Sequence, residues 1–147
     1  MITVIQSTGK QTGSSVSSIT LTLNGVAQGN TILVLVAEYR SAGLNVTHTV
    51  SDAEGVYSRD VMMVGGTSVG GDGPMCAGVH RMTGVNSGTH SITVSASTGT
   101  SNLTAIALEV HSSFTANRIY KEWDRRATGS STSPATGATP ATSQAAS

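Results

Sequence analysis

Large apolar side chains alternate with small hydroxyl side chains along several short segments of this chain. In residues 90–97, His, Ile, Val and Ala take turns with Ser and Thr, and residues 18–23 repeat the pattern with Ile, Leu, Ser and Thr. Successive side chains of a β-strand point to opposite faces, so the pattern predicts strands with one buried and one water-facing side. Such strands are expected to stack as sheets around one core.

Further strands are predicted at residues 31–37, 45–50, 56–64, 75–82, 103–110 and 118–126, and residues 1–6 also alternate like a strand. Residues 31–37 are nearly all apolar, which predicts a central strand covered on both faces. Asn24-Gly25, Gly29-Asn30 and residues 51–55 are typical turn sequences, and the glycine-rich residues 65–74 predict a long loop at one end of the fold. About eight or nine strands at intervals of roughly 8–12 residues predict an all-β fold, a two-sheet antiparallel β-sandwich that is jelly-roll-like.

The chain divides by composition into two parts. The sandwich is expected in residues 1–126, and residues 127–147 form an extended arm or linker rich in Ser, Thr, Ala, Gly and Pro. That arm lacks large apolar side chains, so on its own it cannot bury enough surface to offset the entropy of ordering it.

Charge and cysteine content exclude several classes of function. Eight basic and eight acidic side chains cancel, so we expect no nucleic-acid partner. The single Cys76 cannot form an internal disulfide and is expected to be a small buried core residue. The N-terminal residues lack the basic start and apolar run of a signal peptide, and no apolar stretch approaches the length of a membrane span. We therefore expect synthesis in a host cytoplasm and no membrane partner.

Five segments give the chain a resemblance to a known module. They are residues 29–34 (GNTILV), 50–57 (VSDAEGVY), 88–94 (GTHSITV), 105–110 (AIALEV) and 128–134 (TGSSTSP). In this order they resemble a β-sandwich module that recurs in bacteriophage virion proteins and in bacterial surface or secreted proteins. These are turn and strand signatures, so the resemblance implies a fold much more than an activity.

The chain departs from the pattern of that module at two places. Val56 stands where the module usually has Asn, and the Ser/Thr/Pro stretch normally leads into further hydrophobic strands, whereas this sequence stops. Either the sequence is trimmed there, or another subunit closes the open sheet edge by adding a strand. The second alternative favours an oligomer.

Residues that could carry catalysis do not form an established pattern. Residues 66–70 (GTSVG) match the G-x-S-x-G nucleophile pattern, but a glycine loop follows Ser68 where that chemistry needs a helix. Glu38 and Glu109 each end an apolar strand, and glycoside hydrolysis would need both carboxylates on a common groove. Without aromatic platforms for a sugar this hypothesis is weak. We expect no enzyme and no cofactor.

Residues that could bind a metal ion also lack the spacing of an established site. The four histidines are expected to be separate surface or rim residues: His48, His80, His90 and His111. Four acids fit turns better than a calcium loop: Asp52, Glu54, Asp60 and Asp72. We therefore expect no metal site.

The segment of residues 118–126 offers the best candidates for contact with a partner. Tyr120 and Trp123 do not alternate onto one strand face, so one of them is expected to be exposed, either as a contact residue or as a core anchor. Arg125 and Arg126 belong to a mixed-charge edge that could form ion pairs across a subunit contact.

These features together predict a non-catalytic structural protein of a phage virion, located in the virion. A capsid decoration (cement) protein or the base of a fibre fits best, with the major capsid protein or another virion protein as partner and a homo-oligomer such as a trimer as the assembled form. The alternative is an extracellular carbohydrate- or cell-surface-binding module of an adhesin or secreted protein.

Overall fold

The computed structural model describes residues 3–39, 48–64, 75–96 and 99–111. Within these residues the regular elements are ten strands: β1 (Thr3–Ser7), β2 (Gln11–Val16), β3 (Ser18–Val26), β4 (Thr31–Tyr39), β5 (Thr49–Asp52), β6 (Gly55–Val56), β7 (Ser58–Val64), β8 (Met75–Thr83), β9 (Gly88–Ser95) and β10 (Ser101–His111). None of the described residues belongs to a helix that is long and apolar enough to cross a membrane.

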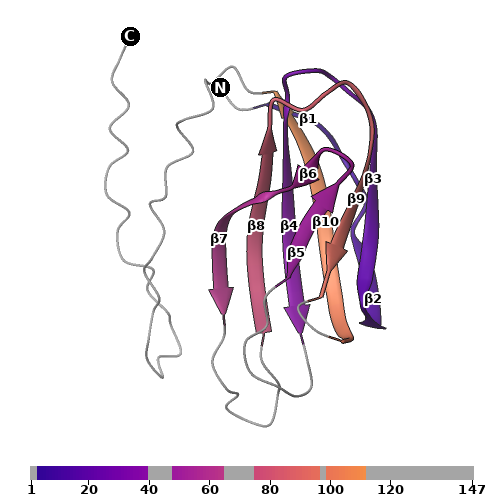
Figure 1. Cartoon of the computed structure of the whole chain (residues 1–147), viewed down its shortest axis with the longest axis vertical. Coiled ribbons are helices and arrows are strands. Elements are labelled where there is room, and N and C mark those ends of the chain that lie inside the picture. Colours follow the sequence, from indigo (N-terminus) through magenta and orange to yellow (C-terminus); the bar gives the residue numbers. More distant parts are fainter. Residues whose placement is uncertain (1–2, 40–47, 65–74, 97–98, 112–147) are drawn as a thin grey trace, which may run out of the picture.

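The strands form a six-stranded and a four-stranded sheet that pack face to face (Figure 1). The larger sheet has the order β1-β10-β4-β8-β7, with β2 also pairing with β10, and the smaller sheet has the order β3-β9-β5-β6. All these pairings are antiparallel. With β1 and β2 counted as one broken strand and β7 as an added edge, the two sheets have the strand order of a jelly roll. The predicted two-sheet antiparallel sandwich is confirmed.

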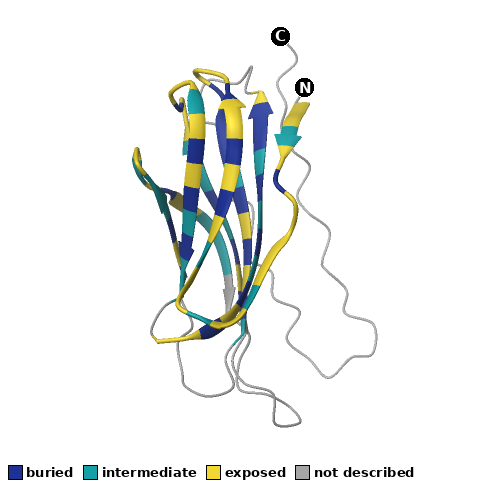
Figure 2. Ribbon diagram, turned by 90° about the vertical axis from the view of Figure 1, so that its right-hand side faces the viewer, coloured by how far each residue is buried: buried dark blue, intermediate teal, exposed yellow. Residues whose placement is uncertain are grey.

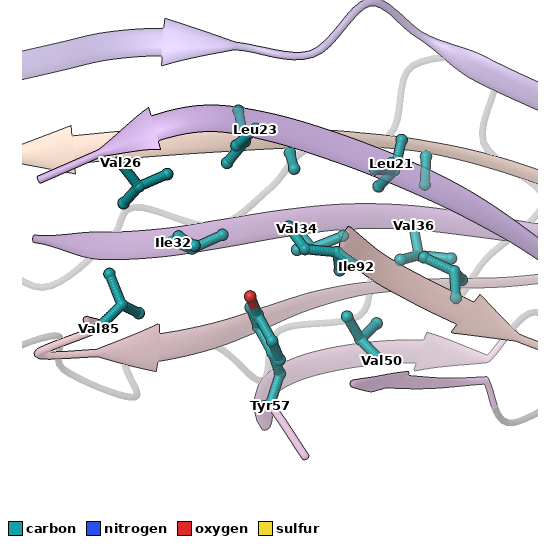
Figure 3. Close-up of a cluster of buried hydrophobic side chains, with 13 residues drawn as sticks. Leu21, Leu23, Val26, Ile32, Val34, Val36, Val50, Tyr57, Val85 and Ile92 are labelled. Atoms are coloured by element: carbon teal, nitrogen blue, oxygen red, sulfur yellow. The ribbon is translucent and has the colours of Figure 1, made fainter. Parts of the chain in front are cut away.

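The core lies between the sheets, where the inward-facing positions of the alternating strands meet. Figure 2 shows buried and exposed residues alternating along the strands. The buried apolar cluster consists of Leu21, Leu23, Val26, Ile32, Val34, Val36, Val50, Tyr57, Val85, Ile92, Val94, Ala105 and Ala107 (Figure 3). Burying a side chain of Leu, Ile or Val size contributes roughly 1.5–3 kcal/mol, so this cluster dominates the stability of the sandwich.

One local prediction needs correction, one strand was missed, and one prediction is confirmed. Asn24-Gly25 is not a turn: it lies within β3, where the pairing with β9 shifts between Leu23 and Val26, and Gly25 takes a φ of 63°. The left-handed backbone at this glycine makes a bulge, and the chain turns after it, at Gln28 and Gly29. Strand β2 was not predicted, because its sequence QTGSSV has no apolar alternation. Cys76 is buried, as expected.

Candidate functional site

A group of buried polar side chains lies on the inner face of the six-stranded sheet, towards the end where β4 finishes and β10 begins. Glu38, Ser101, His48 and His80 are each at most 3 % exposed. The Ser101 hydroxyl donates a hydrogen bond to Glu38 Oε1 at 2.5 Å, and His48 Nδ1 lies 3.6 Å from Glu38 Oε2. The ring centroids of His48 and His80 are 5.0 Å apart. The sandwich therefore has two histidines and a carboxylate inside its core.

Gly78 creates the space for this cluster. Cys76, Gly78 and His80 occupy alternate, inward-facing positions of β8, and His48 precedes β5 of the opposite sheet. A Cβ atom on Gly78 would lie 2.7 Å from His48 Nε2 and 3.1 Å from the Val61 carbonyl oxygen. A side chain at position 78 would force the imidazole of His48 to move, so Gly78 leaves the room in which the ring lies.

The hydrogen bonding of the cluster does not form a nucleophile–base pair. Ser101 donates to the carboxylate and not to an imidazole. Among the described residues no group meets a ring nitrogen of His48 or His80 with good hydrogen-bond geometry, and the Tyr57 backbone near His80 acts against the lowering of its pKa. Burial, with the nearby positive charge of Arg59, lowers the pKa of both histidines to about 4, and His48 itself contributes to the shift at His80. Both imidazoles are therefore neutral at neutral pH, because burial disfavours the charged form of the ring.

This geometry corrects the prediction of four separate surface or rim histidines. His48, His80 and His90 are buried, two of them are in contact, and His111 is exposed. Across the described part of the chain, however, no three His, Cys, Asp or Glu side chains are grouped so that they could hold a metal ion. No feature of the sequence indicated this pair, because His48 and His80 are far apart along the chain and no ligand spacing connects them.

A second polar network surrounds His90 at the turn between β5 and β6. His90 Nδ1 lies 2.8 Å from Asp52 Oδ2, and its Nε2 lies 3.0 Å from the Asn86 carbonyl oxygen. Tyr57 donates its hydroxyl hydrogen to the same Asp52 oxygen at 2.9 Å, and the Glu54 amide donates to Asp52 Oδ1 at 2.8 Å. Asp52 thus organises its turn, as its sequence position predicts.

The charge state of this second network follows from its contacts. Both ring nitrogens of His90 face acceptors, so the ring fits best as an imidazolium that donates twice. Burial alone would lower the pKa of His90, but Asp52 and the Asn86 carbonyl outweigh it and raise the pKa. Burial likewise opposes ionisation of Asp52, yet the hydrogen bonds from His90, the Glu54 amide and Tyr57 lower its pKa. The network is a buried ion pair that joins β5 to β9.

Glu38 and Glu109 do not share a groove. Both are about 1 % exposed, and the pairing register places Glu109 opposite Ile32, six residues from Glu38 along β4. At about 3.4 Å per residue this separates the carboxylates by roughly 20 Å, far beyond the spacing that glycoside hydrolysis uses. Glu109 instead accepts hydrogen bonds from Gln6 Nε2 at 2.6 Å, Asn30 Nδ2 at 2.6 Å and the Ala27 amide at 2.9 Å. It ties the N-terminal strand and the β3–β4 turn to β10.

The predicted contact residues Tyr120, Trp123, Arg125 and Arg126 lie outside the described residues, as do Ser68 and Asp72. Asp60 forms a half-buried ion pair with Arg81, at 3.1 Å between the carboxylate and the guanidinium nitrogen.

The outer faces of the two sheets differ sharply in chemistry. The four-stranded sheet presents Ser and Thr in register, with Thr20 opposite Thr93 and Thr22 opposite Ser91. The six-stranded sheet presents large apolar side chains on three adjacent strands, in rows set by the register: Leu35 lies between Ile106 and Val79, and Leu33 lies between Leu108 and Arg81, whose guanidinium is paired with Asp60. The apolar residues of these rows are Leu33, Leu35, Val79, Ile106 and Leu108. We call these five residues the apolar outer face. An antiparallel sheet with one face in water normally carries polar residues on that face. The apolar side chains here therefore indicate a face that is suited to packing against another surface.

The centre of the apolar outer face is open among the described residues. Leu35 is 41 % exposed although β4 is a central strand, and Ile106, Leu108, Leu33 and Val79 are half-buried. A shallow groove runs beside Leu35, lined by Lys10 and by residues of β4 and β10 that include Ile106. The prediction that residues 31–37 are covered on both faces therefore holds for the core side only, within the described residues.

Comparison with known protein families, curated proteins and solved structures finds no match to this chain.

Proposed function

We propose that this protein is a non-catalytic structural component of a virion, a capsid decoration protein or fibre-base protein, whose apolar outer face packs against a partner virion protein. The observation that carries the proposal is the group of large apolar side chains around Leu35 on the outer face of the six-stranded sheet. The outer face of the four-stranded sheet is mainly Ser and Thr, with Val56 as an exposed exception. A face of Leu, Ile and Val on a rigid sheet favours a flat, non-polar contact with another protein. The major capsid protein or another virion protein is the proposed partner.

The free energy of burying an apolar face can stabilise a shell when many copies each bury one. Removing apolar surface from water contributes about 25 cal/mol per Å², and a stable interface covers about 800 Å² on each partner. The zero net charge of the chain is consistent with recognition by apolar burial and shape, with little long-range electrostatic steering. Many copies that each bind weakly stabilise a shell by mass action, because they bind the assembled form.

The virion setting is one of the two settings of the module that residues 29–34, 50–57, 88–94, 105–110 and 128–134 resemble, which recurs in phage virion proteins and in bacterial surface or secreted proteins. A homo-oligomeric form is part of the proposal, because the described sheets have edge strands, such as β7, to which a neighbouring copy can add a strand. Of the two described tyrosines, Tyr57 is buried and Tyr39 is half-buried, so the described residues give no specific support to a sugar-binding surface.

The test is binding to particles. Particles from a host that produces the protein are banded on a density gradient and probed for it, and particles stripped of it are then incubated with purified wild-type chain, Leu35→Lys or Thr22→Lys. Leu35→Lys places a charge at the centre of the apolar outer face, and Thr22→Lys places the same charge on the outer face of the other sheet.

Wild type and Thr22→Lys are expected to sediment with the particles and to raise the temperature at which they release their genome, whereas Leu35→Lys does neither. A protein that is absent from every particle band, or that leaves particle stability unchanged, refutes the proposal. If Leu35→Lys binds the particles as tightly as wild type does, the apolar outer face is not the surface that contacts the particle. Binding to a glycan array in place of particles would favour the carbohydrate-binding alternative.

A further inference from the structure

We propose that the partner covers the apolar outer face with an extended, apolar segment that carries a carboxylate, and that this carboxylate pairs with Lys10. This deepens the proposed function and rests on it, because the charge of Lys10 needs an ionic partner only when the face is covered. Three observations carry it: the position of Lys10, the charges of the described residues, and the course of the apolar side chains along β10.

Lys10 is held over the outer face of β10 by anchors on either side of it. The Thr8 amide donates to the Ala107 carbonyl oxygen at 2.8 Å, and the Thr8 hydroxyl accepts from the Ala107 amide at 2.9 Å. Gln11 then pairs with Ala105 of the same strand. Lys10 therefore lies over the stretch of β10 between these two anchors, where it lines the groove of the apolar outer face.

Among the described residues, no acidic side chain forms an ion pair with Lys10. The described acids lie in the core, in the ion pair with Arg81 or in the network around His90: Glu38, Glu109, Asp60, Asp52 and Glu54. In water an ammonium group needs no such partner, but one that a bound protein takes out of water does. The described sheet offers no carboxylate to this position, so the matching group is assigned to the partner.

The apolar side chains continue from the groove along β10 to the opposite end of the face. Ile106, Leu108 and Val110 occupy alternate positions of β10 and so share its outer side, over roughly 14 Å. β1 pairs with this end through a bulge, which sets both Val4 and Ile5 against Val110. Val4 and Ile5 are 55 % and 53 % exposed, and β1 carries no charge. The strip is therefore apolar at this end and positively charged at the groove, which fixes the direction of the partner segment.

The shape of the groove favours a protein segment over a small molecule. The groove is shallow, with a volume of about 320 Å³, whereas sites for small molecules enclose most of the surface of the ligand. An extended segment places alternate side chains on the face and brings one carboxylate within reach of Lys10. A single ion pair at the rim of a contact adds little affinity, so its main effect is to select and orient the partner.

The experiment measures the binding of two peptides to the full-length protein by titration followed by two-dimensional NMR. One short, acetylated and amidated peptide alternates leucine with serine and has glutamate at one end, and the other has glutamine in place of the glutamate. The proteins are wild type, Lys10→Gln, Lys10→Arg and Thr22→Glu. Lys10→Gln and Thr22→Glu lower the net charge equally, so this control separates the position of the charge from its amount.

Wild type, Lys10→Arg and Thr22→Glu are expected to bind the glutamate peptide several-fold more tightly than the glutamine peptide, with resonance shifts centred on Leu35 and Ile106. Lys10→Gln is expected to bind both peptides equally. No binding of either peptide, equal binding of both by wild type, or a preference that survives in Lys10→Gln overturns the inference.

Two other occupants of the face are distinguished in the same titrations. Dodecanoate that binds more tightly than the glutamate peptide assigns the groove to a free amphiphile, and shifts at Leu35 that grow with protein concentration in the absence of peptide assign it to a second copy. Either result overturns the inference. These titrations need no particles, so they are decided separately from particle binding, which tests the proposed function.

Discussion

Lowering the pH from about 7.5 to about 5 is expected to destabilise the sandwich through His48 and His80. Burial holds the pKa of each ring at about 4, against 6.5 in a solvated histidine. Between these two values the unfolded chain binds more protons than the folded one, so the free energy of unfolding falls as the pH falls. The stability is fully present above about pH 6.5 and is lost progressively down to about pH 4.

The size of the effect follows from the shift. One pH unit corresponds to about 1.4 kcal/mol per site, so each histidine costs about 2 kcal/mol at pH 5 and about 3 kcal/mol at pH 4. The two rings lie 5.0 Å apart, so protonating one makes protonating the other harder, and their contributions are not independent. Against a typical domain stability of about 5–15 kcal/mol this loss is large enough to measure.

The assay is urea unfolding followed by circular dichroism at a series of pH values, for wild type, His48→Leu and His80→Leu. Leucine approximates the volume of histidine and does not titrate. His48→Leu also removes the imidazole that lies 3.6 Å from Glu38 Oε2, whereas His80→Leu leaves that contact in place, so the two variants separate the titration from the loss of this contact. Each variant is expected to lose about 2 kcal/mol less than wild type between about pH 7.5 and pH 5. His111→Leu controls for the loss of an exposed imidazole. Curves for wild type and both core variants that fall in parallel would refute the reasoning.

Three further predictions concern single contacts. Asp52→Asn is expected to lower the free energy of unfolding by about 1–3 kcal/mol near pH 6 and by less at higher pH. The reason is that the raised pKa of His90 contributes stability below about pH 6.5, which is lost as the pH rises through the pKa of the folded state. Thermal melting at a series of pH values measures this, and a cost that does not change with pH contradicts it. Glu109→Gln is expected to lower the free energy of unfolding by about 1–3 kcal/mol, because an amide replaces a carboxylate that accepts three hydrogen bonds. Urea unfolding measures the loss, and an unchanged midpoint would show that the three donors find other partners. Gly78→Ala is expected to cost about 1–3 kcal/mol in the same assay because its Cβ would overlap His48, and a neutral result would mean that the ring moves at no cost.

Most of the sheet architecture could be predicted from the sequence, because the alternation of apolar and hydroxyl residues matches the strand period directly. β3, β9 and β10 were predicted to within a few residues of their bounds. β2 could not be found, because it is held by backbone pairing with β10 and its side chains are mostly exposed and polar. Asn24-Gly25 has the composition of a turn, and only the pairing with β9 makes it a bulge.

The candidate site was harder to predict, for two physical reasons. The histidine pair joins residues from different sheets over Gly78, so only tertiary packing brings His48 and His80 together. The apolar outer face did leave a signal, since β4 is apolar at both odd and even positions, but a run of that kind also describes a strand buried on both sides. Which surface covers the second side is not encoded in the strand itself.

The long pairing between the two ends of the described chain sets the order in which the molecule can be built. Val4 meets Val110 and Ser7 meets Leu108, contacts between residues more than a hundred positions apart. During synthesis β1 therefore has no strand to pair with until β10 has left the ribosome, and closing so large a loop is slow. Until then β4 also lacks one of its two neighbouring strands, so Leu33 and Leu35 do not yet have Leu108 and Ile106 beside them. Closure of the described sandwich therefore depends on a final pairing step that joins its two ends.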